Sequence, residues 1–186
     1  MAAQSVKIRL KAVRTKAGLS LSQTAELTEV SKAMLGQIER GESSPTIATL
    51  WKLAKGFHLP LSAFIEDMGP TIGALSPARR SAVKFEDSIE VRTLFAFDPA
   101  FGTETFIITL SPGQTHASDP HDSGIIEDVF VISGRIEILQ GSHVKVMAAG
   151  DGLRFKADQP HGYRNIGASP AILHNTMHYQ KAGLLE

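Results

Sequence analysis

The 186-residue chain has no cysteine, no surplus of charge of either sign and no apolar run that approaches the roughly 18 residues of a membrane-spanning helix. Without cysteine, disulfide bonds and thiolate metal sites are excluded. The N-terminus also lacks the apolar core of a secretory signal peptide. With a hydrophobic content of 42%, we expect a soluble, cytoplasmic, globular protein that has no membrane partner.

The zero net charge hides an unequal distribution of charge along the chain. Residues 1–67 hold nine Lys and Arg against six Asp and Glu, whereas the remainder holds 10 against 13. The length also suits two small domains better than one. These features predict a basic first domain that contacts nucleic-acid phosphates and an acidic second domain that does not. Because the basic excess is modest, we expect two copies of the chain to act together on DNA.

Residues 20–41 have the pattern of two short helices joined by a tight turn. Ser20 and Gln23 have the spacing of a capping box, and Ser31 can cap a second helix over residues 32–40. At 100° per residue, that helix turns one apolar face inward and a small, polar face outward. The inward residues are Leu35 and Ile38, and the outward residues are Ala33, Gly36, Gln37 and Arg40. Such an outward face suits a helix that lies in the major groove of DNA.

Three further helices are expected around this pair, which gives a compact all-α domain of five helices over residues 1–67. The first spans residues 6–16 and is stopped by Gly18. The fourth begins at Pro45 or Thr46, and a short fifth covers residues 59–65. Met34 and Trp51 have the helical spacing of core residues and are interpreted as packing. Residues 68–83 contain two prolines and two glycines and are expected to form a linker.

Three stretches within residues 6–67 resemble the helix-turn-helix domain of the lambda-repressor-like (XRE) family: GLSLSQTAEL, VSKAMLGQIERGESSPTIATLWKLAKGF and LPLSAFIED. The resemblance implies base-facing positions at Lys32, Ala33 and Gln37, and phosphate-facing positions at Ser22, Gln23, Ser31 and Arg40. It also implies that Glu39 pairs with Arg14 as part of the scaffold. Glu29 stands where the family usually has glycine, so we expect it to adopt a left-handed conformation.

From residue 84 the hydrophobic period changes to two, which predicts β-strands. Seven candidate strands are separated by turns rich in Gly, Pro, Asp and Ser: residues 89–97, 103–110, 128–133, 135–141, 143–150, 152–155 and 171–179. No helical pattern interrupts them. An all-β antiparallel sandwich or barrel is therefore expected over residues 84–186.

Two stretches of this half resemble the paired motifs of the cupin superfamily. The first is PGQTHASDPHDSGIIEDVFVISGRIEI, in which six residues separate Glu127 from Gly134. The second is GDGLRFKADQPHGYRN, in which His161 is followed after three residues by Asn165. The resemblance implies a C-terminal cupin domain, which is a double-stranded β-helix or jelly-roll barrel.

Cupin enzymes usually hold a divalent metal ion, and the sequence leaves two interpretations of this site. The histidine-x-histidine pair of the family is absent, but His121, Glu127 and His161 could form a two-histidine, one-carboxylate set that suits iron, manganese or nickel. Alternatively, Glu127 and His161 are the polar ends of a small-molecule pocket, satisfied by water, by Tyr163 or by each other. His174 and His178 share one face of the last strand, and that face could point inward or outward.

The favoured function is a transcriptional regulator, not an enzyme. A homodimer would read a palindromic operator in double-stranded DNA with the helix over residues 32–40, and the cupin domain would sense a small-molecule effector. The alternative is a mononuclear iron oxygenase that resembles the fosfomycin-pathway epoxidase, in which the helical domain serves the active site. A third option is a DNA-binding protein whose cupin domain only joins two copies.

Overall fold

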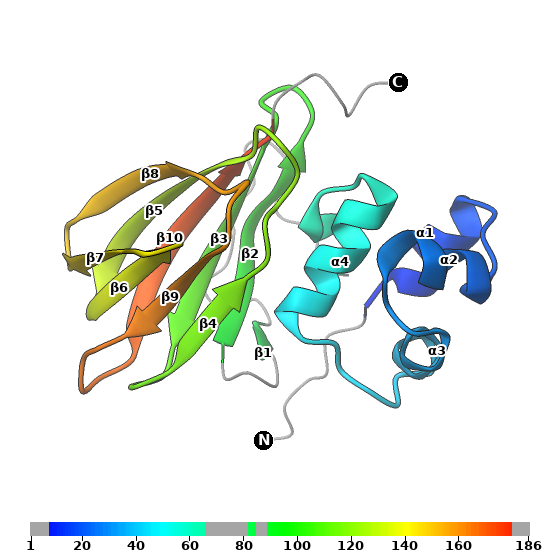
Figure 1. Cartoon of the computed structure of the whole chain (residues 1–186), viewed down its shortest axis with the longest axis horizontal. Coiled ribbons are helices and arrows are strands. Elements are labelled where there is room, and N and C mark those ends of the chain that lie inside the picture. The colour runs from blue at the N-terminus through cyan, green and yellow to red at the C-terminus, as the bar shows by residue number, and fades with distance from the viewer. Residues whose placement is uncertain (1–7, 66–81, 85–88, 180–186) are drawn as a thin grey trace.

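The computed structural model describes residues 8–65, 82–84 and 89–179. Helices gather at one end of the molecule and strands at the other (Figure 1). Within the described residues there are four α-helices and one 3-10 turn, which are α1 (Leu10–Lys16), α2 (Leu21–Thr28), α3 (Lys32–Arg40), α4 (Ile47–Phe57) and η1 (Leu61–Phe64). Most of the expected linker at residues 68–83 lies outside the described part of the chain.

The expected count of five helices is wrong. The fifth is only the four-residue 3-10 turn η1, which follows Pro60, and its first backbone N–H groups donate to a side chain of the β-domain instead of building an α-helix. The first helix begins at Leu10, later than expected, because Ile8 pairs with Ile65 in an isolated β-bridge. Met34 is 37% exposed, so its assignment to the core is also wrong.

The capping signals in the sequence are confirmed. Ser20 Oγ accepts a hydrogen bond from the backbone N–H of Gln23, and the Gln23 side chain accepts one from the N–H of Ser20, which completes the capping box at α2. Ser31 caps α3 by accepting from Met34 N–H at 3.2 Å. Thr46 caps α4 in the same way. These bonds satisfy donors that a helix N-terminus otherwise leaves unpaired.

The described strands form two sheets in which every paired strand is antiparallel (Figure 1). The six-stranded sheet has the order β1-β2-β3-β10-β5-β8, and the four-stranded sheet has the order β4-β9-β6-β7. Their bounds are β1 Val83–Lys84, β2 Ile89–Asp98, β3 Thr103–Leu110, β4 Thr115–Ser118, β5 Ile126–Ser133, β6 Arg135–Gln140, β7 His143–Ala148, β8 Gly152–Lys156, β9 His161–Asn165 and β10 Ala171–His178.

The seven expected strands are all present, and the sequence pattern missed β1, β4 and β9. Strands β4 and β9 pair with each other and consist largely of polar residues and glycine, so hydrophobic alternation does not reveal them. The apolar core lies between the two sheets, where Val131 and Leu173 of one sheet and Ile136 and Ile138 of the other are fully buried.

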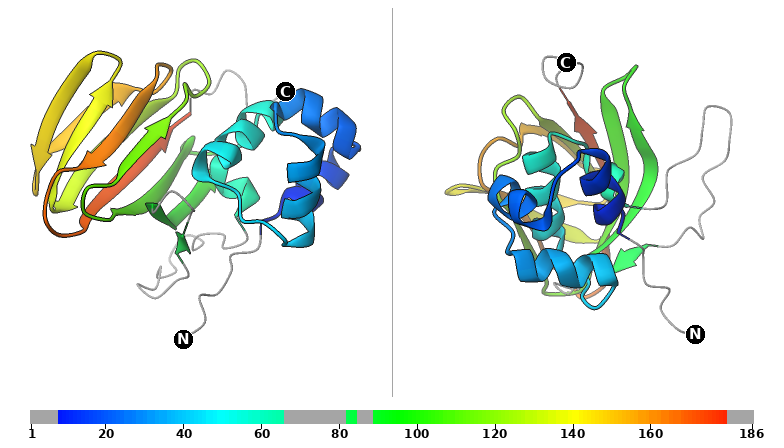
Figure 2. Two further views of the ribbon diagram at one scale, coloured as in Figure 1. Left: turned by 60° about the horizontal axis from the view of Figure 1, so that its bottom comes forward. Right: turned by 90° about the vertical axis from the view of Figure 1, so that its right-hand side faces the viewer.

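Helix α4 lies beside the sheets, and α1, α2 and α3 lie beyond it (Figure 1). In the right-hand view of Figure 2, α3 runs across the near end of the molecule, on the side away from the strands. None of the helices in the described part is long and apolar enough to cross a membrane. The arrangement leaves α3 accessible and brings α4 and η1 against the end of the β-domain.

Candidate functional site

Helix α3 is fixed by its apolar face and presents its polar face to solvent. Leu35 is fully buried and Ile38 is 4% exposed, and both belong to the core of the helical domain. The side chains that the sequence assigns to DNA contacts are all exposed; they are Ser22, Gln23, Ser31, Lys32, Ala33, Gln37 and Arg40. These residues therefore occupy one accessible surface, although Gln23 and Ser31 also serve as helix caps.

An ion pair braces α3 against the first helix. The Arg14 guanidinium donates to both carboxylate oxygens of Glu39, at 2.6 and 2.9 Å, and a third hydrogen bond from Arg14 reaches the carbonyl of Leu19 at 2.8 Å. Both side chains of the pair are mostly buried. A two-pronged contact of this kind sets an orientation as well as adding stability. The scaffold role expected of Arg14 and Glu39 fits this geometry.

The turn before α3 contains the expected left-handed residue. Glu29 has φ 55° and ψ 25°, in the region that glycine adopts without strain. Arg40, at the other end of α3, is held by an exposed neighbour, because its guanidinium donates to both carboxylate oxygens of Glu42 at 2.7 Å. The carboxylate of Glu42 therefore occupies two of the donor atoms that Arg40 could offer to a phosphate.

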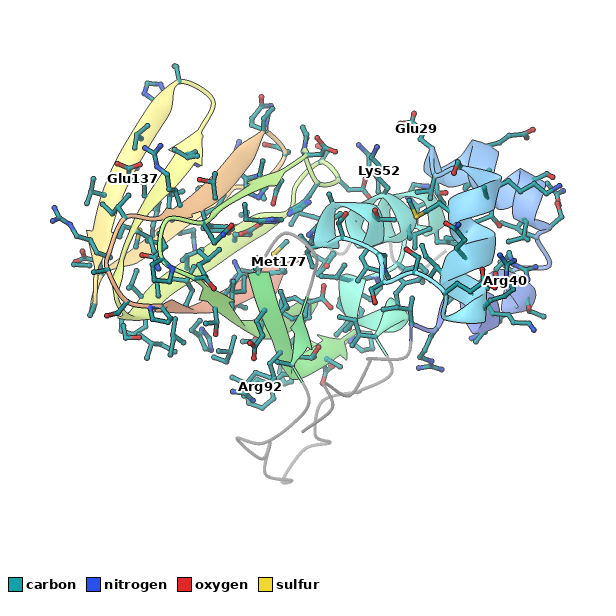
Figure 3. The ribbon with its side chains drawn as sticks, turned by 90° about the horizontal axis from the view of Figure 1, so that it is seen from below. Glu29, Arg40, Lys52, Arg92, Glu137 and Met177 are labelled. Atoms are coloured by element: carbon teal, nitrogen blue, oxygen red, sulfur yellow. The ribbon has the colours of Figure 1, made fainter. Side chains whose placement is uncertain are left out.

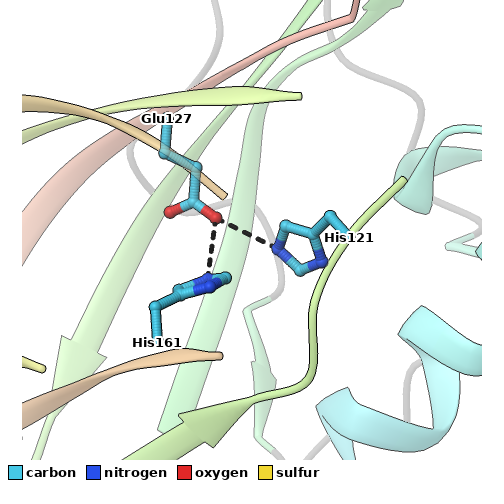
Figure 4. Close-up of side chains that lie close together, drawn as sticks. All are labelled: His121, Glu127 and His161. Carbon is cyan, nitrogen blue, oxygen red and sulfur yellow. Dashed lines mark hydrogen bonds and ion pairs between the residues drawn. The ribbon is translucent and has the colours of Figure 1, made fainter. Parts of the chain in front are cut away.

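The second cluster of sequence-predicted residues comes together between the two sheets. Glu127 lies on β5 of the six-stranded sheet, His161 on β9 of the four-stranded sheet, and His121 on the segment between β4 and β5 (Figure 4). Oε1 of Glu127 lies 3.0 Å from Nε2 of His121 and 3.1 Å from Nε2 of His161. One ligand atom from each residue lies within 4.8 Å of the other two, and all three side chains are buried.

The second oxygen of Glu127 has its own donors. Oε2 accepts a hydrogen bond from the hydroxyl of Tyr163 and another from Nδ2 of Asn175 at 2.8 Å. Tyr163 is on β9 and Asn175 on β10, so three strands fix the carboxylate. As a result Oε1 alone faces the two histidines. The carboxylate can therefore offer one oxygen to a cation without breaking its other contacts.

The hydrogen bond of His161 leaves its other ring nitrogen near this oxygen. Nδ1 of His161 lies 2.9 Å from the carbonyl oxygen of Gln159, which can only accept, so Nδ1 carries a proton. Nε2 of His161 is buried, and the angle of its contact with Glu127 does not suit a hydrogen bond. In a neutral His161 this nitrogen would carry a lone pair, and it lies 3.1 Å from a carboxylate oxygen. A metal cation bound by both atoms would satisfy the lone pair and the carboxylate together.

Electrostatics in this cluster favour an ionised carboxylate. Burial would raise the pKa of Glu127, but its contacts with His121 and His161 outweigh burial and hold that pKa below its ordinary value. Burial lowers the pKa of His121 in spite of the neighbouring carboxylate. Burial also opposes the charged form of His161, yet Glu127 raises its pKa above the usual value. A negative group facing two imidazoles is the donor set that iron, manganese or nickel accept.

The last strand resolves the alternative for its two histidines. Leu173, Asn175 and Met177 of β10 are buried, so the alternate residues His174 and His178 point away from the barrel interior. His178 contacts Asp128 at 2.9 Å on that outer face. The inward polar residue is Asn175, which sequence reasoning missed. Its place in phase with Leu173 and Met177 is the signal that could have identified it.

Trp51 also has a role that the sequence did not suggest. Its indole, on α4 of the helical domain, lies against the imidazole of His121 with ring centroids 3.8 Å apart. The cavity inside the barrel is closed on that side by Trp51 together with Ile47 and Leu61 of the helical domain. The interpretation of Trp51 as mere helix packing therefore needs correction, because the helical domain covers the mouth of the barrel.

A buried carboxylate links the two domains by hydrogen bonds next to the open end of the barrel. Glu104 of β3 accepts hydrogen bonds from the backbone N–H groups of Leu61 and Ser62, at 3.1 and 2.9 Å, and from the hydroxyl of Tyr179. Ser62 in turn accepts from the N–H of Phe97 at 3.1 Å. The start of η1 is thus capped by a side chain of the β-domain, which links α4 mechanically to the strands.

Comparison with known proteins agrees with this division of the chain. Residues 10–64 match a helix-turn-helix family and residues 106–177 match a cupin domain family. The chain is 40% identical to the HTH-type transcriptional regulator SutR of Escherichia coli K12 over 181 residues, which covers 97% of this chain and 98% of SutR.

Solved structures show the same arrangement. An HTH_3 family transcriptional regulator from Vibrio cholerae has a TM-score of 0.76 at 41% identity, with 92% of this chain and 93% of that chain covered. The iron(II) form of the protein HppE has a TM-score of 0.50 at 17% identity and covers 90% of this chain and 95% of its own. The latter likeness concerns the fold alone.

Proposed function

The chain belongs to the family of helix-turn-helix transcriptional regulators, here with a cupin domain, and from this premise we propose that a cytoplasmic homodimer reads a palindromic operator with α3. Residues 1–67 would form the DNA-binding domain and residues 84–186 the sensing domain. Lys32, Ala33 and Gln37 would face base edges. Ser22, Gln23, Ser31 and Arg40 would approach phosphates. Binding of a small molecule to the cupin domain would change the affinity for the operator.

One observation carries the DNA-binding part of this proposal. Helix α3 is held against the core by Leu35, Ile38 and the Arg14–Glu39 pair. Gly36 is buried, contrary to the expectation that it faces outward, but the outward residues Ala33, Gln37 and Arg40 are exposed. A recognition helix needs this combination, because base contacts depend on a fixed placement of the side chains that reach into the groove.

Substitution of Gln37 tests the assignment of α3. An amide side chain can hydrogen-bond an adenine edge at two points, so Gln37→Ala should cost about 1–3 kcal/mol of operator affinity and relax specificity at one base pair. Binding to a fragment recovered from genomic DNA would be measured by fluorescence polarisation. Gln140→Ala, on β6, is the matched control and should bind as the wild type does. Equal behaviour of the two variants would remove Gln37 from the DNA surface.

The cupin pocket fits a divalent metal ion in its donor set. His121, Glu127 and His161 would be its ligands, and the metal would supply a Lewis acid inside the barrel. Tyr163 and Asn175 would hold the carboxylate in place, and the Gln159 carbonyl would keep the proton of His161 on the far nitrogen. We propose that this site serves sensing and not turnover, as expected for a regulator.

The contact between the helical domain and the cupin site also fits the oxygenase alternative. Trp51 of the helical domain lies on His121, so the helical domain completes the surroundings of the histidine and carboxylate cluster. An oxygenase would retain a tightly bound metal and select no DNA sequence. A regulator would select DNA whether or not metal is present. Elemental analysis of the purified protein together with DNA selection separates the two functions.

A further inference from the structure

The space inside the barrel is too small for an organic effector. The cavity lined by Glu127, Tyr163 and Asn175 has a volume of about 30 Å³, which is enough for a water molecule. A metal ion or a water molecule fits there. Ligand sites for small organic molecules occupy roughly 300–1,000 Å³. An effector of that size must therefore bind elsewhere in the described structure or force the barrel open.

A larger cleft lies directly outside, between the helical domain and the β-domain. Its volume is about 590 Å³, within the range of small-molecule sites. Trp51 and His121 contribute to this cleft and also line the inner cavity, so their adjacent, tilted rings lie between the two spaces. Lys52 and Glu29, which both line the cleft, project on the same side of the helical domain (Figure 3).

The cleft is lined by charged groups of both signs. Helix α4 and the residue after it provide Lys52, Lys55 and His58, and Glu26 and Glu29 lie on the same helical side. The segment of the β-domain around His121 provides the carboxylates of Asp119 and Asp122. Among the described residues, one ion pair crosses the cleft, and it is long, with 3.7 Å between Nδ1 of His58 and Oδ2 of Asp122. The side chain of His58 is 77% exposed and that of Asp122 is 41% exposed. The cationic and anionic groups therefore remain available to a ligand.

We propose that this cleft binds the effector and that the effector is a small zwitterion of the amino-acid type. Its carboxylate would lie toward Lys52 and Lys55, and its ammonium group would lie toward Asp119 and Asp122. Its carbon skeleton would cover the indole of Trp51. The proposal rests on the proposed function and adds the place and chemical class of the signal. A ligand bound to both walls would fix α4 relative to the β-domain and so favour one placement of the DNA-binding domain.

The sole tryptophan of the chain provides the readout, because Trp51 lies at the base of the cleft. Each proteinogenic amino acid would be titrated into the full-length protein while the fluorescence of Trp51 is followed. At least one should give a saturable change. Its decarboxylated amine and its deaminated acid each lack one charge, and both should bind about fivefold or more weakly.

Two substitutions locate the binding. Lys55→Gln and Asp122→Asn should each weaken binding of that amino acid by about fivefold, since each removes one charge of the cleft. Lys145→Gln on β7 and Glu90→Gln on β2 are matched controls on exposed strand positions and should leave binding unchanged. Addition of the amino acid should also shift operator affinity in the wild type and shift it less in the two cleft variants.

Several results would overturn this inference. Trp51 fluorescence that no amino acid changes would do so, and so would equal binding of the amine or the acid. Binding that survives both cleft substitutions but is lost in Asn175→Ala would place the ligand inside the barrel. These failures leave operator recognition intact, whereas failure of the protein to select any DNA would defeat the proposed function itself.

Discussion

At the scale of single residues, the two oxygens of the Glu127 carboxylate have different tasks. Tyr163 and Asn175 hold Oε2, and Oε1 faces His121 and His161. Motif spacing points to Glu127 and His161, whereas His121 is proposed as a nearby histidine that could complete the set. Asn175 could not be placed in the same way, because its contact depends on the register in which β10 pairs with β5. The cluster is thus only partly visible in the sequence.

Arg40 gives the first prediction at this scale. Glu42 binds Nε and Nη2 along one edge of the Arg40 guanidinium and competes with a phosphate for these donors. Glu42→Gln should therefore raise operator affinity about two- to fivefold, with a smaller gain as salt increases. The dissociation constant would be measured by fluorescence polarisation at several salt concentrations.

The matched control for this prediction is Glu137→Gln on β6, which removes a carboxylate paired with an arginine at the opposite end of the molecule (Figure 3). It changes the net charge by the same amount but should leave affinity nearly unchanged. An equal gain in both variants would mean that overall charge, and not release of Arg40, sets the affinity.

At the scale of elements, the sequence predicted those helices whose boundaries are set by residues close to them in the chain. Ser20, Ser31 and Thr46 each cap the helix that follows, and the bounds of α3 agree with the expected range. Expectations failed where distant contacts decide the outcome. The chain at Leu61 forms a 3-10 turn whose backbone N–H donates to the carboxylate of Glu104, a residue 43 positions away. No local pattern contains that information.

Gly36 in the middle of α3 gives a prediction about an element. An added Cβ would meet Nη1 of Arg40 at 3.0 Å and nothing else closer than 3.9 Å, and the end of the arginine side chain can move. Gly36→Ala should therefore stabilise the helical domain by up to about 1 kcal/mol through helix propensity. Urea denaturation would measure the change.

Gly56 of α4 is the contrasting control. A Cβ there would lie 2.7 Å from the backbone carbonyl oxygen of Leu27 and 2.7 Å from Cγ2 of Thr28, which have no room to move. Gly56→Ala should destabilise the protein by about 1–3 kcal/mol. A destabilising effect at Gly36 would show that α3 needs the close approach of the Arg40 side chain over its backbone.

At the scale of the whole molecule, the helical domain packs against the open end of the barrel. Trp51 covers His121, and the carboxylate of Glu104 holds the start of η1. The two domains could each be predicted from their own motifs. The contact between them could not, because neither motif contains information about the residues of the other domain. It offers a physical route by which events near His121 reach α4 and the helices beyond it.

The buried carboxylate at this junction predicts a pH dependence. Burial outweighs the donors from Tyr179 and Ser62 and raises the pKa of Glu104 above its ordinary value. A group with a raised pKa in the folded state contributes stability at low pH that is lost as pH rises through that value. The free energy of unfolding of the wild type should therefore fall relative to Glu104→Gln as pH increases above the ordinary pKa of glutamate.

Urea titrations over a range of pH, followed through Trp51 at the same junction, would measure the difference between the two proteins. Comparison with the glutamine variant cancels the other titrating groups to a first approximation. A wild type that gains stability over the variant with rising pH would show that the donors of η1 and Tyr179 outweigh burial.

The central claim is that α3 reads a specific sequence, and the most direct test is selection from a pool of random DNA duplexes by the full-length protein at moderate salt. The account predicts enrichment of an inverted repeat whose half-sites lie about one helical turn apart, roughly 34 Å. A pool that remains random after repeated rounds, while the protein stays folded, would contradict it.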